Sequence, residues 1–204
     1  MAGVAIGSYG EQEASTRGSM KGVVPAHLKE RFDYLDSLVP GDPPLPWRKV
    51  PTLHVGGLWH LGFGDRSDLL LLVSVSGRGV IACSSGGRLA RDDADYYPNA
   101  GTLEAEGIGP LHGELVHVAG VSGGGLSRAT SDGWSIELHP LSWPDEELIL
   151  CPPGQTMLWQ APDAATSLVK LLPPPSALVA FGFSPTGKSF VVATSSNIMI
   201  YNRD

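Results

Sequence analysis

Apolar residues near the start of the chain follow the period of a helix. They recur at the i, i+4, i+7, i+11 spacing of one helix face: Leu28, Phe32, Leu35 and Val39. Pro25 lies at the first turn of this pattern and Pro40-Gly41 follows its end, which are positions where helices begin and stop. We therefore expect one helix from Pro25 to Val39, with its apolar stripe packed on the rest of the protein.

From residue 52 onwards the apolar pattern becomes that of strands. Four hairpin-like units have β-rich flanks around a turn dipeptide: Leu69 to Ala82 about Ser76-Gly77, Gly125 to Leu138 about Asp132-Gly133, Leu148 to Trp159 about Pro153-Gly154, and Phe190 to Tyr201 about Ser196-Asn197. Asp-Gly and similar dipeptides are the turns that short hairpins prefer. These units predict short antiparallel strands over most of the chain.

The first and last of these units match each other without a gap at a spacing of about 120 residues. Three segments correspond in order: Gly62-Phe63 to Gly182-Phe183, Leu70-Leu71-Leu72 to Phe190-Val191-Val192, and Val80-Ile81 to Ile200-Tyr201. This spacing is three times the roughly 40 residues of a propeller repeat, so four sheets in a ring would fit. The inner units, which turn at Asp132 and Pro153, do not keep the spacing, so any ring would be irregular or open.

The chain divides into three segments. Residues 1–22 are rich in Gly, Ser and Glu and lack an apolar period, which predicts a flexible arm. Residues 23–50 hold the helix and a Pro-rich connector, and residues 51–204 form the β domain. The expected fold is mostly β and antiparallel, an irregular small propeller-like or multi-sheet β domain with one N-terminal helix.

The C-terminal unit resembles a blade of a WD-repeat propeller. The motif runs through Phe183-Ser184-Pro185-Thr186-Gly187-Lys188, Val191-Val192-Ala193-Thr194 and Ile198-Met199-Ile200-Tyr201, with Tyr201-Asn202 in the place of Trp-Asp. The chain is also similar to uncharacterised bacterial proteins in the order of four segments: Gly62-Phe63-Gly64-Asp65, Gly77-Arg78-Gly79-Val80, Glu106-Gly107-Ile108-Gly109-Pro110 and Asp132-Gly133-Trp134. The first resemblance implies a propeller-like blade. The second implies a family but supplies no activity.

Composition narrows the class of partner and the compartment. Charged residues are 17% and hydrophobic residues 42%, enough apolar surface for a folded core. The net charge is -7 and the 14 Lys and Arg are spread thinly, which argues against a nucleic-acid binder and suits a basic protein partner. The two cysteines, Cys83 and Cys151, form no disulfide framework. The sequence has neither a signal peptide nor an apolar run of ~20 residues, so we expect a cytoplasmic protein outside the membrane.

One segment formally matches a catalytic motif. Gly120-Val121-Ser122-Gly123-Gly124 fits the G-x-S-x-G elbow of serine hydrolases, and Asp132 and His139 follow in hydrolase order. An elbow needs a helix after its serine, whereas the residues that follow Ser122 have the pattern of strand and turn. We expect a glycine-rich strand connection here, with a hydrolase using Ser122, Asp132 and His139 as the alternative.

No metal or cofactor is expected. The histidines have no zinc spacing, and Asp93-x-Asp95 lacks the further ligands of a calcium loop because Tyr97 occupies the next alternate position. The glycines around Ser122 also lack the Gly-Lys-Ser/Thr ending of a phosphate loop.

The densest acidic and aromatic cluster consists of Asp92, Asp93, Asp95, Tyr96 and Tyr97. It is either a solvated loop between sheets or a partner-contact loop, and we take it as the candidate partner-binding site together with Trp134, an aromatic residue expected to be exposed after its turn. The predicted function is a non-catalytic protein-binding module, in its sharper form a bacterial immunity-type inhibitor that binds a basic toxin enzyme domain. A scaffold subunit of a larger assembly is an open alternative.

Overall fold

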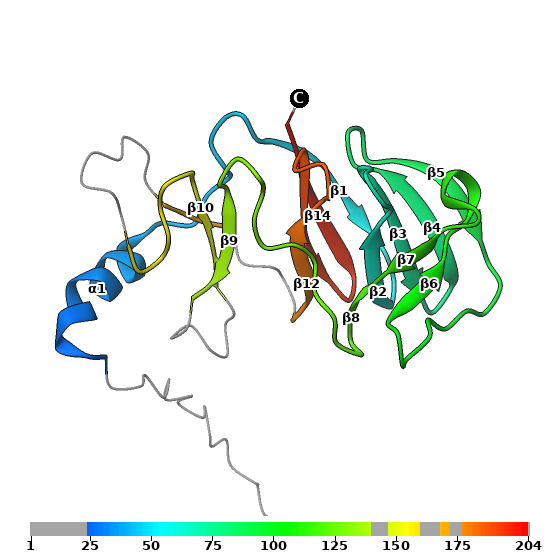
Figure 1. Ribbon diagram of the computed structural model, residues 1–204, viewed down its shortest axis with the longest axis horizontal. Coiled ribbons are helices and arrows are strands. Elements are labelled where there is room, and N and C mark those ends of the chain that lie inside the picture. The colour runs from blue at the N-terminus through cyan, green and yellow to red at the C-terminus, as the bar shows by residue number, and fades with distance from the viewer. Residues whose placement is uncertain (1–23, 140–146, 160–167, 172–176, 204) are drawn as a thin grey trace, which may run out of the picture.

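A computed structural model describes residues 24–139, 147–159, 168–171 and 177–203. Within them lie two 3-10 turns, one α-helix and fourteen strands: η1 Ala26–Leu28, α1 Lys29–Ser37, β1 Arg48–His54, β2 Leu58–Phe63, β3 Leu69–Ser74, β4 Gly77–Ala82, β5 Gly87–Asp92, β6 Glu104–Glu106, η2 Gly109–Leu111, β7 Leu115–His117, β8 Ala119–Gly120, β9 Ser135–Leu138, β10 Leu148–Cys151, β11 Val169–Lys170, β12 Leu178–Phe183, β13 Ser189–Thr194 and β14 Asn197–Asn202. The strand pairs are antiparallel and form several sheets, which confirms the expected multi-sheet β fold with one N-terminal helix. The sheets stand in a row in Figure 1. The expected flexible arm, residues 1–22, lies outside the described residues.

The helix forms where the apolar stripe predicted it, but it is shorter. Phe32 and Leu35 are buried and pack with Ile149 and Cys151 of β10. Val39 was expected on the same stripe, and this was wrong, because the helix ends at Ser37 and Val39 is 85% exposed. Pro40 explains the early end, since the residue before a proline is disfavoured in helical geometry.

The two units that match in sequence form equivalent meanders. Strands β2-β3-β4 and β12-β13-β14 pair in the same register, with Phe63 opposite Leu70 and Phe183 opposite Phe190. The first pair of strands in each meander carries an irregularity at the corresponding place, after Leu58 and after Leu178. The hairpins predicted around Ser76-Gly77 and Ser196-Asn197 are therefore confirmed.

The fourth strand of each sheet comes from a different part of the chain. In the first sheet β5 follows β4 directly, and the strand order is β5-β4-β3-β2-β8. In the second sheet the order is β1-β14-β13-β12, so β1, from the N-terminal side, takes the place that β5 has in the first. This strand begins at Arg48, before the connector was expected to end, and Trp47 is already buried in the core.

The two inner units depart from the predicted hairpins. A turn forms at Asp132-Gly133, but among its flanks only β9 is a strand, and β10 pairs with β9 and β11 rather than with the residues after Gly154. Pro152 and Pro153 follow β10 directly and have no N–H group to donate to a ladder, so the β10 ladder ends at Cys151.

Successive side chains of the central strands enter different cores, because alternate residues of a strand point to opposite faces. On β13, Val191 and Ala193 pack between the two equivalent sheets, whereas Phe190 and Val192 pack against the sheet β11-β10-β9. On β3, Leu71 and Val73 face η2 and the β6–β7 pair. Sheets buried on both faces require continuous apolar runs such as residues 69–73.

Hydrogen bonds also join the equivalent turns of the two meanders. The carboxylate of Asp68, in the β2–β3 turn, accepts hydrogen bonds from Ser184 Oγ at 2.6 Å and from Thr186 Oγ1 at 2.8 Å. Both hydroxyls belong to the corresponding β12–β13 turn. The bond network therefore joins the two sheets at one end of their inner strands.

Candidate functional site

The acidic and aromatic cluster predicted from the sequence is a loop fixed by one arginine, Arg78 of β4. Its Nη2 donates to Asp92 Oδ2 at 2.6 Å and its Nη1 to the carbonyl oxygen of Glu106 at 2.9 Å. Its guanidinium carbon lies 3.9 Å from the centre of the Tyr96 ring, and the Tyr96 hydroxyl accepts from the Glu106 amide at 2.7 Å. The hydrogen bond from Arg78 lowers the pKa of Asp92 from its ordinary value. Arg78 thus holds both ends of the residues 92–96 segment.

A glycine permits this close packing. Gly77 has φ +95°, and a Cβ there would lie 2.1 Å from the carbonyl oxygen of Asp92. Arg91 also donates to the carbonyl of Ser76, next to Gly77, and pairs with Asp93 at 2.5 Å. The loop is therefore seated on the β3–β4 turn.

Of the three aspartates, two are paired within the protein. Asp92 is paired with Arg78 and Asp93 with Arg91, whereas Asp95 makes no hydrogen bond or ion pair within the described residues. Nothing in the local sequence pattern distinguishes the three aspartates. Asp95 therefore carries the free negative charge of this loop.

The two tyrosines also differ. Tyr96 is half-buried under Arg78, whereas Tyr97 is 71% exposed and stacks on the Trp59 ring of β2, with 5.2 Å between ring centres and 26° between planes. We call Trp59 and Tyr97 the aromatic patch. Trp59 was not singled out from the sequence, since its contact with Tyr97 joins residues 38 apart whose proximity no local pattern indicates.

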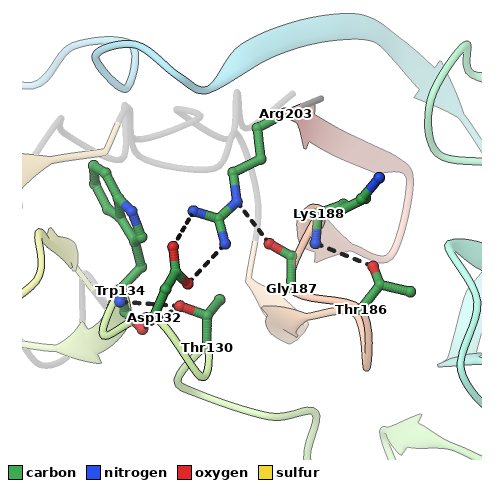
Figure 2. Close-up of polar contacts among 7 residues, drawn as sticks. All are labelled: Thr130, Asp132, Trp134, Thr186, Gly187, Lys188 and Arg203. Atoms are coloured by element: carbon green, nitrogen blue, oxygen red, sulfur yellow. Dashed lines mark hydrogen bonds and ion pairs between the residues drawn. The ribbon is translucent and has the colours of Figure 1, made fainter.

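Trp134 does not belong to this surface. It was expected to be exposed after its turn, and this was wrong, because the side chain is only 7% exposed. Its ring meets Trp47 edge-on, with 5.7 Å between centres. Both rings lie in the core between the sheet β11-β10-β9 and the sheet β1-β14-β13-β12, which we call the C-terminal sheet. Figure 2 shows its amide bonded to Thr130 Oγ1, at 3.0 Å, within the tight turn. Burial removes the exposure for which Trp134 was selected.

The three residues of the hydrolase alternative have separate surroundings. The Ser122 amide donates to Nε2 of His60 at 3.3 Å. Asp132 bonds Arg203 (Figure 2), and His139 packs edge-on against Phe32 with 5.7 Å between ring centres. None of these neighbours is shared, so the geometry of a Ser-His-Asp triad is not assembled from them.

His60, which the sequence did not link to Ser122, contacts the turn formed by residues 120–124. Because Nε2 accepts the Ser122 amide proton, the neutral ring carries its own proton on Nδ1, and that buried atom has no partner within the described residues. Burial lowers the pKa of His60 from its ordinary value. The contact reaches the backbone of Ser122 and not its hydroxyl, so His60 supports the turn and is not placed as a base for Ser122.

Within the parts of the chain that the structure describes, no group of three or more His, Cys, Asp or Glu is arranged to hold a metal ion. None of the described helices has the length and apolar character to cross a membrane. No known protein family, curated protein or solved structure matches this chain.

Proposed function

We propose that the protein is a non-catalytic protein-binding module whose contact surface is the aromatic patch with Asp95 beside it. The observation that carries this proposal is the state of Tyr97, which is 71% exposed while its ring is stacked on Trp59. An exposed aromatic ring held in one orientation contributes large contact area, and little conformational entropy is lost when it binds. Arg78 adds to this by fixing the preceding residues of the loop.

The charge of the chain favours a basic partner. The formal net charge is -7, and Asp95 is exposed and unpaired within the described residues next to the aromatic patch. Opposite charges of this kind raise association rates, whereas buried aromatic contacts slow dissociation. The sharper form of the proposal is an immunity-type inhibitor that covers a basic surface of a bacterial toxin enzyme. A scaffold subunit would use the same surface within a larger assembly.

Site-specific crosslinking tests the proposal. A photoreactive phenylalanine derivative replaces Tyr97 in one variant and Trp159 in a control variant, since Trp159 is 57% exposed but belongs to the region after β10. Irradiation in cells of the source organism, followed by mass spectrometry, should give one stoichiometric protein adduct from position 97 and none from position 159. An adduct with a secreted toxin enzyme supports the inhibitor form, and an adduct with a stable complex supports the scaffold form. Equal crosslinking at both positions, or none at position 97, contradicts the proposed surface.

The hydrolase alternative receives no support from the positions of its residues. Asp132 forms an ion pair with Arg203, and His139 packs against Phe32 of the N-terminal helix.

A further inference from the structure

A cleft of about 690 Å³ lies between the outer strands β1 and β5 of the two equivalent sheets. One wall is formed by residues 53–56, at the end of β1, and the other by the face of β3, β4 and β5. Gly86, in the β4–β5 turn, approaches Val50 and Leu53 and brings the two walls together at one end. The volume falls in the range of roughly 300–1,000 Å³ that is typical of small-molecule sites.

The strand register places two arginines over an apolar floor. Arg88 pairs with Ile81 and Arg91 with Gly79, and directly paired residues project from the same face of a sheet. Ile81 and Leu72 lie on the face that meets the C-terminal sheet, so the side chains of Arg88 and Arg91 project from this face and line the cleft.

Gly79 accounts for the hollow in this face. It lies between Leu72 and Arg91 in the register, and a Cβ at this position would meet only the Ala90 carbonyl oxygen, at 3.6 Å. A side chain would therefore enter the cleft without a backbone clash.

The two arginines differ in their partners. Arg91 is paired with Asp93 and bonded to the carbonyl of Ser76. Arg88 has no hydrogen bond, ion pair or ring contact within the described residues, and it is the one arginine there of which this is true. With Asp93 included, the charged side chains that line the cleft sum to one positive charge, in a protein whose formal net charge is -7.

We propose that this cleft binds a small organic monoanion with an apolar body. The anionic group pairs with the Arg88 guanidinium, which suits carboxylate-like oxygens because it presents a planar fork of donors. The apolar body lies on Leu53, Leu72 and Ile81, in the space that Gly79 leaves open. This site is separate from the aromatic patch and does not depend on the proposed function.

Sodium octanoate is the probe, and its binding is followed by amide chemical shifts of the isotope-labelled full-length protein. Saturable shifts are expected at residues 53–56, Gly79, Arg88 and Arg91. Arg88→Gln should weaken octanoate binding by about tenfold or more, because a charge-assisted hydrogen bond is lost. The neutral analogue 1-octanol should bind the wild-type protein about tenfold more weakly than octanoate for the same reason.

Two further variants make the result specific. Gly79→Val should weaken octanoate binding, because its side chain occupies the hollow that Gly79 leaves open, and its amide spectrum shows whether the fold is intact. Arg66→Gln removes the same charge from the β2–β3 turn, where the side chain of Arg66 is 91% exposed, and should leave the affinity unchanged. Absence of saturable shifts, shifts that map to the aromatic patch, equal effects of Arg88→Gln and Arg66→Gln, or equal affinity for octanoate and 1-octanol would each overturn the proposal.

Discussion

The guanidinium of Arg203 donates to both carboxylate oxygens of Asp132, at 2.6 and 2.8 Å, and so joins two residues 71 positions apart (Figure 2). The same guanidinium donates from Nε to the Gly187 carbonyl and lies 4.6 Å from the centre of the Trp47 ring. This contact ties the Asp132-Gly133 turn to the end of the C-terminal sheet, and it holds the pKa of Asp132 far below its ordinary value. Asp132 therefore has a structural role.

Asp132→Asn should lower the free energy of unfolding by about 0.5–1 kcal/mol. The substitution removes the bidentate ion pair with Arg203. Because the Asp132 side chain is 51% exposed, water screens much of this interaction and the loss is small. Urea denaturation measures the change. Asp65→Asn is the matched control, because the Asp65–Arg66 pair is longer, at 3.7 Å, and more exposed, and its loss should change stability negligibly. Equal effects of the two substitutions would contradict a clamp at Asp132.

The protein should lose stability as the pH falls below about 6.5, the ordinary pKa of histidine. Burial lowers the pKa of His60 and of His139 in the folded state, so the unfolded chain binds more protons in this range. Stability is then full above the unfolded pKa and falls as the pH passes down through the folded pKa. His60→Gln should make the slope of unfolding free energy against pH shallower. Stability that stays constant or rises on acidification from pH 7 to about 5 would show that protonation of the two histidines does not favour the unfolded chain.

Both cysteines should resist thiol reagents while the protein is folded. Burial raises the pKa of Cys83 and of Cys151 to about 12, and the reactive species is the thiolate. An aromatic disulfide reagent at mildly alkaline pH should label neither thiol in the native protein and both in denaturant. Fast labelling of either thiol without unfolding would show that the core around it is open.

The parts of the fold that local pattern specifies were predictable. The first and last hairpins were predictable because turn dipeptides and apolar runs mark their strands. Their spacing of about 120 residues showed that the two units are equivalent. The hairpins predicted about Asp132-Gly133 and Pro153-Gly154 were wrong. Strand pairing in this region is set by β11 and by the consecutive prolines, and not by the turn dipeptides. Trp134 was misplaced for a similar reason, since its burial depends on a sheet contributed by residues far along the chain.

The candidate surface was predictable only in part. Composition located the loop and its tyrosines, but Arg78 and Trp59 become visible only once the register is known. An arginine between Gly77 and Gly79 in an apolar strand was the available signal, because a charged side chain in such a strand requires a partner.

Ser122→Ala should preserve biological function and stability within about 0.5 kcal/mol. The side chain is exposed, and the hydrogen bond from Ser122 to His60 is donated by its backbone amide, which alanine keeps. A fluorophosphonate serine-hydrolase probe should leave the wild-type protein unlabelled. Covalent labelling at Ser122 would reverse the assignment and revive the hydrolase alternative.

The aromatic patch is tested most directly by the dissociation rate of the complex with the partner identified by crosslinking at position 97. Tyr97→Ala should raise this rate by about tenfold or more, because an anchoring ring is removed, whereas Asp95→Asn should mainly slow association and weaken its salt dependence. Leu115→Ala removes an exposed apolar residue of β7 outside the patch and should change neither rate. If Tyr97→Ala dissociates as slowly as wild type while the fold is intact, the aromatic patch is not the binding surface.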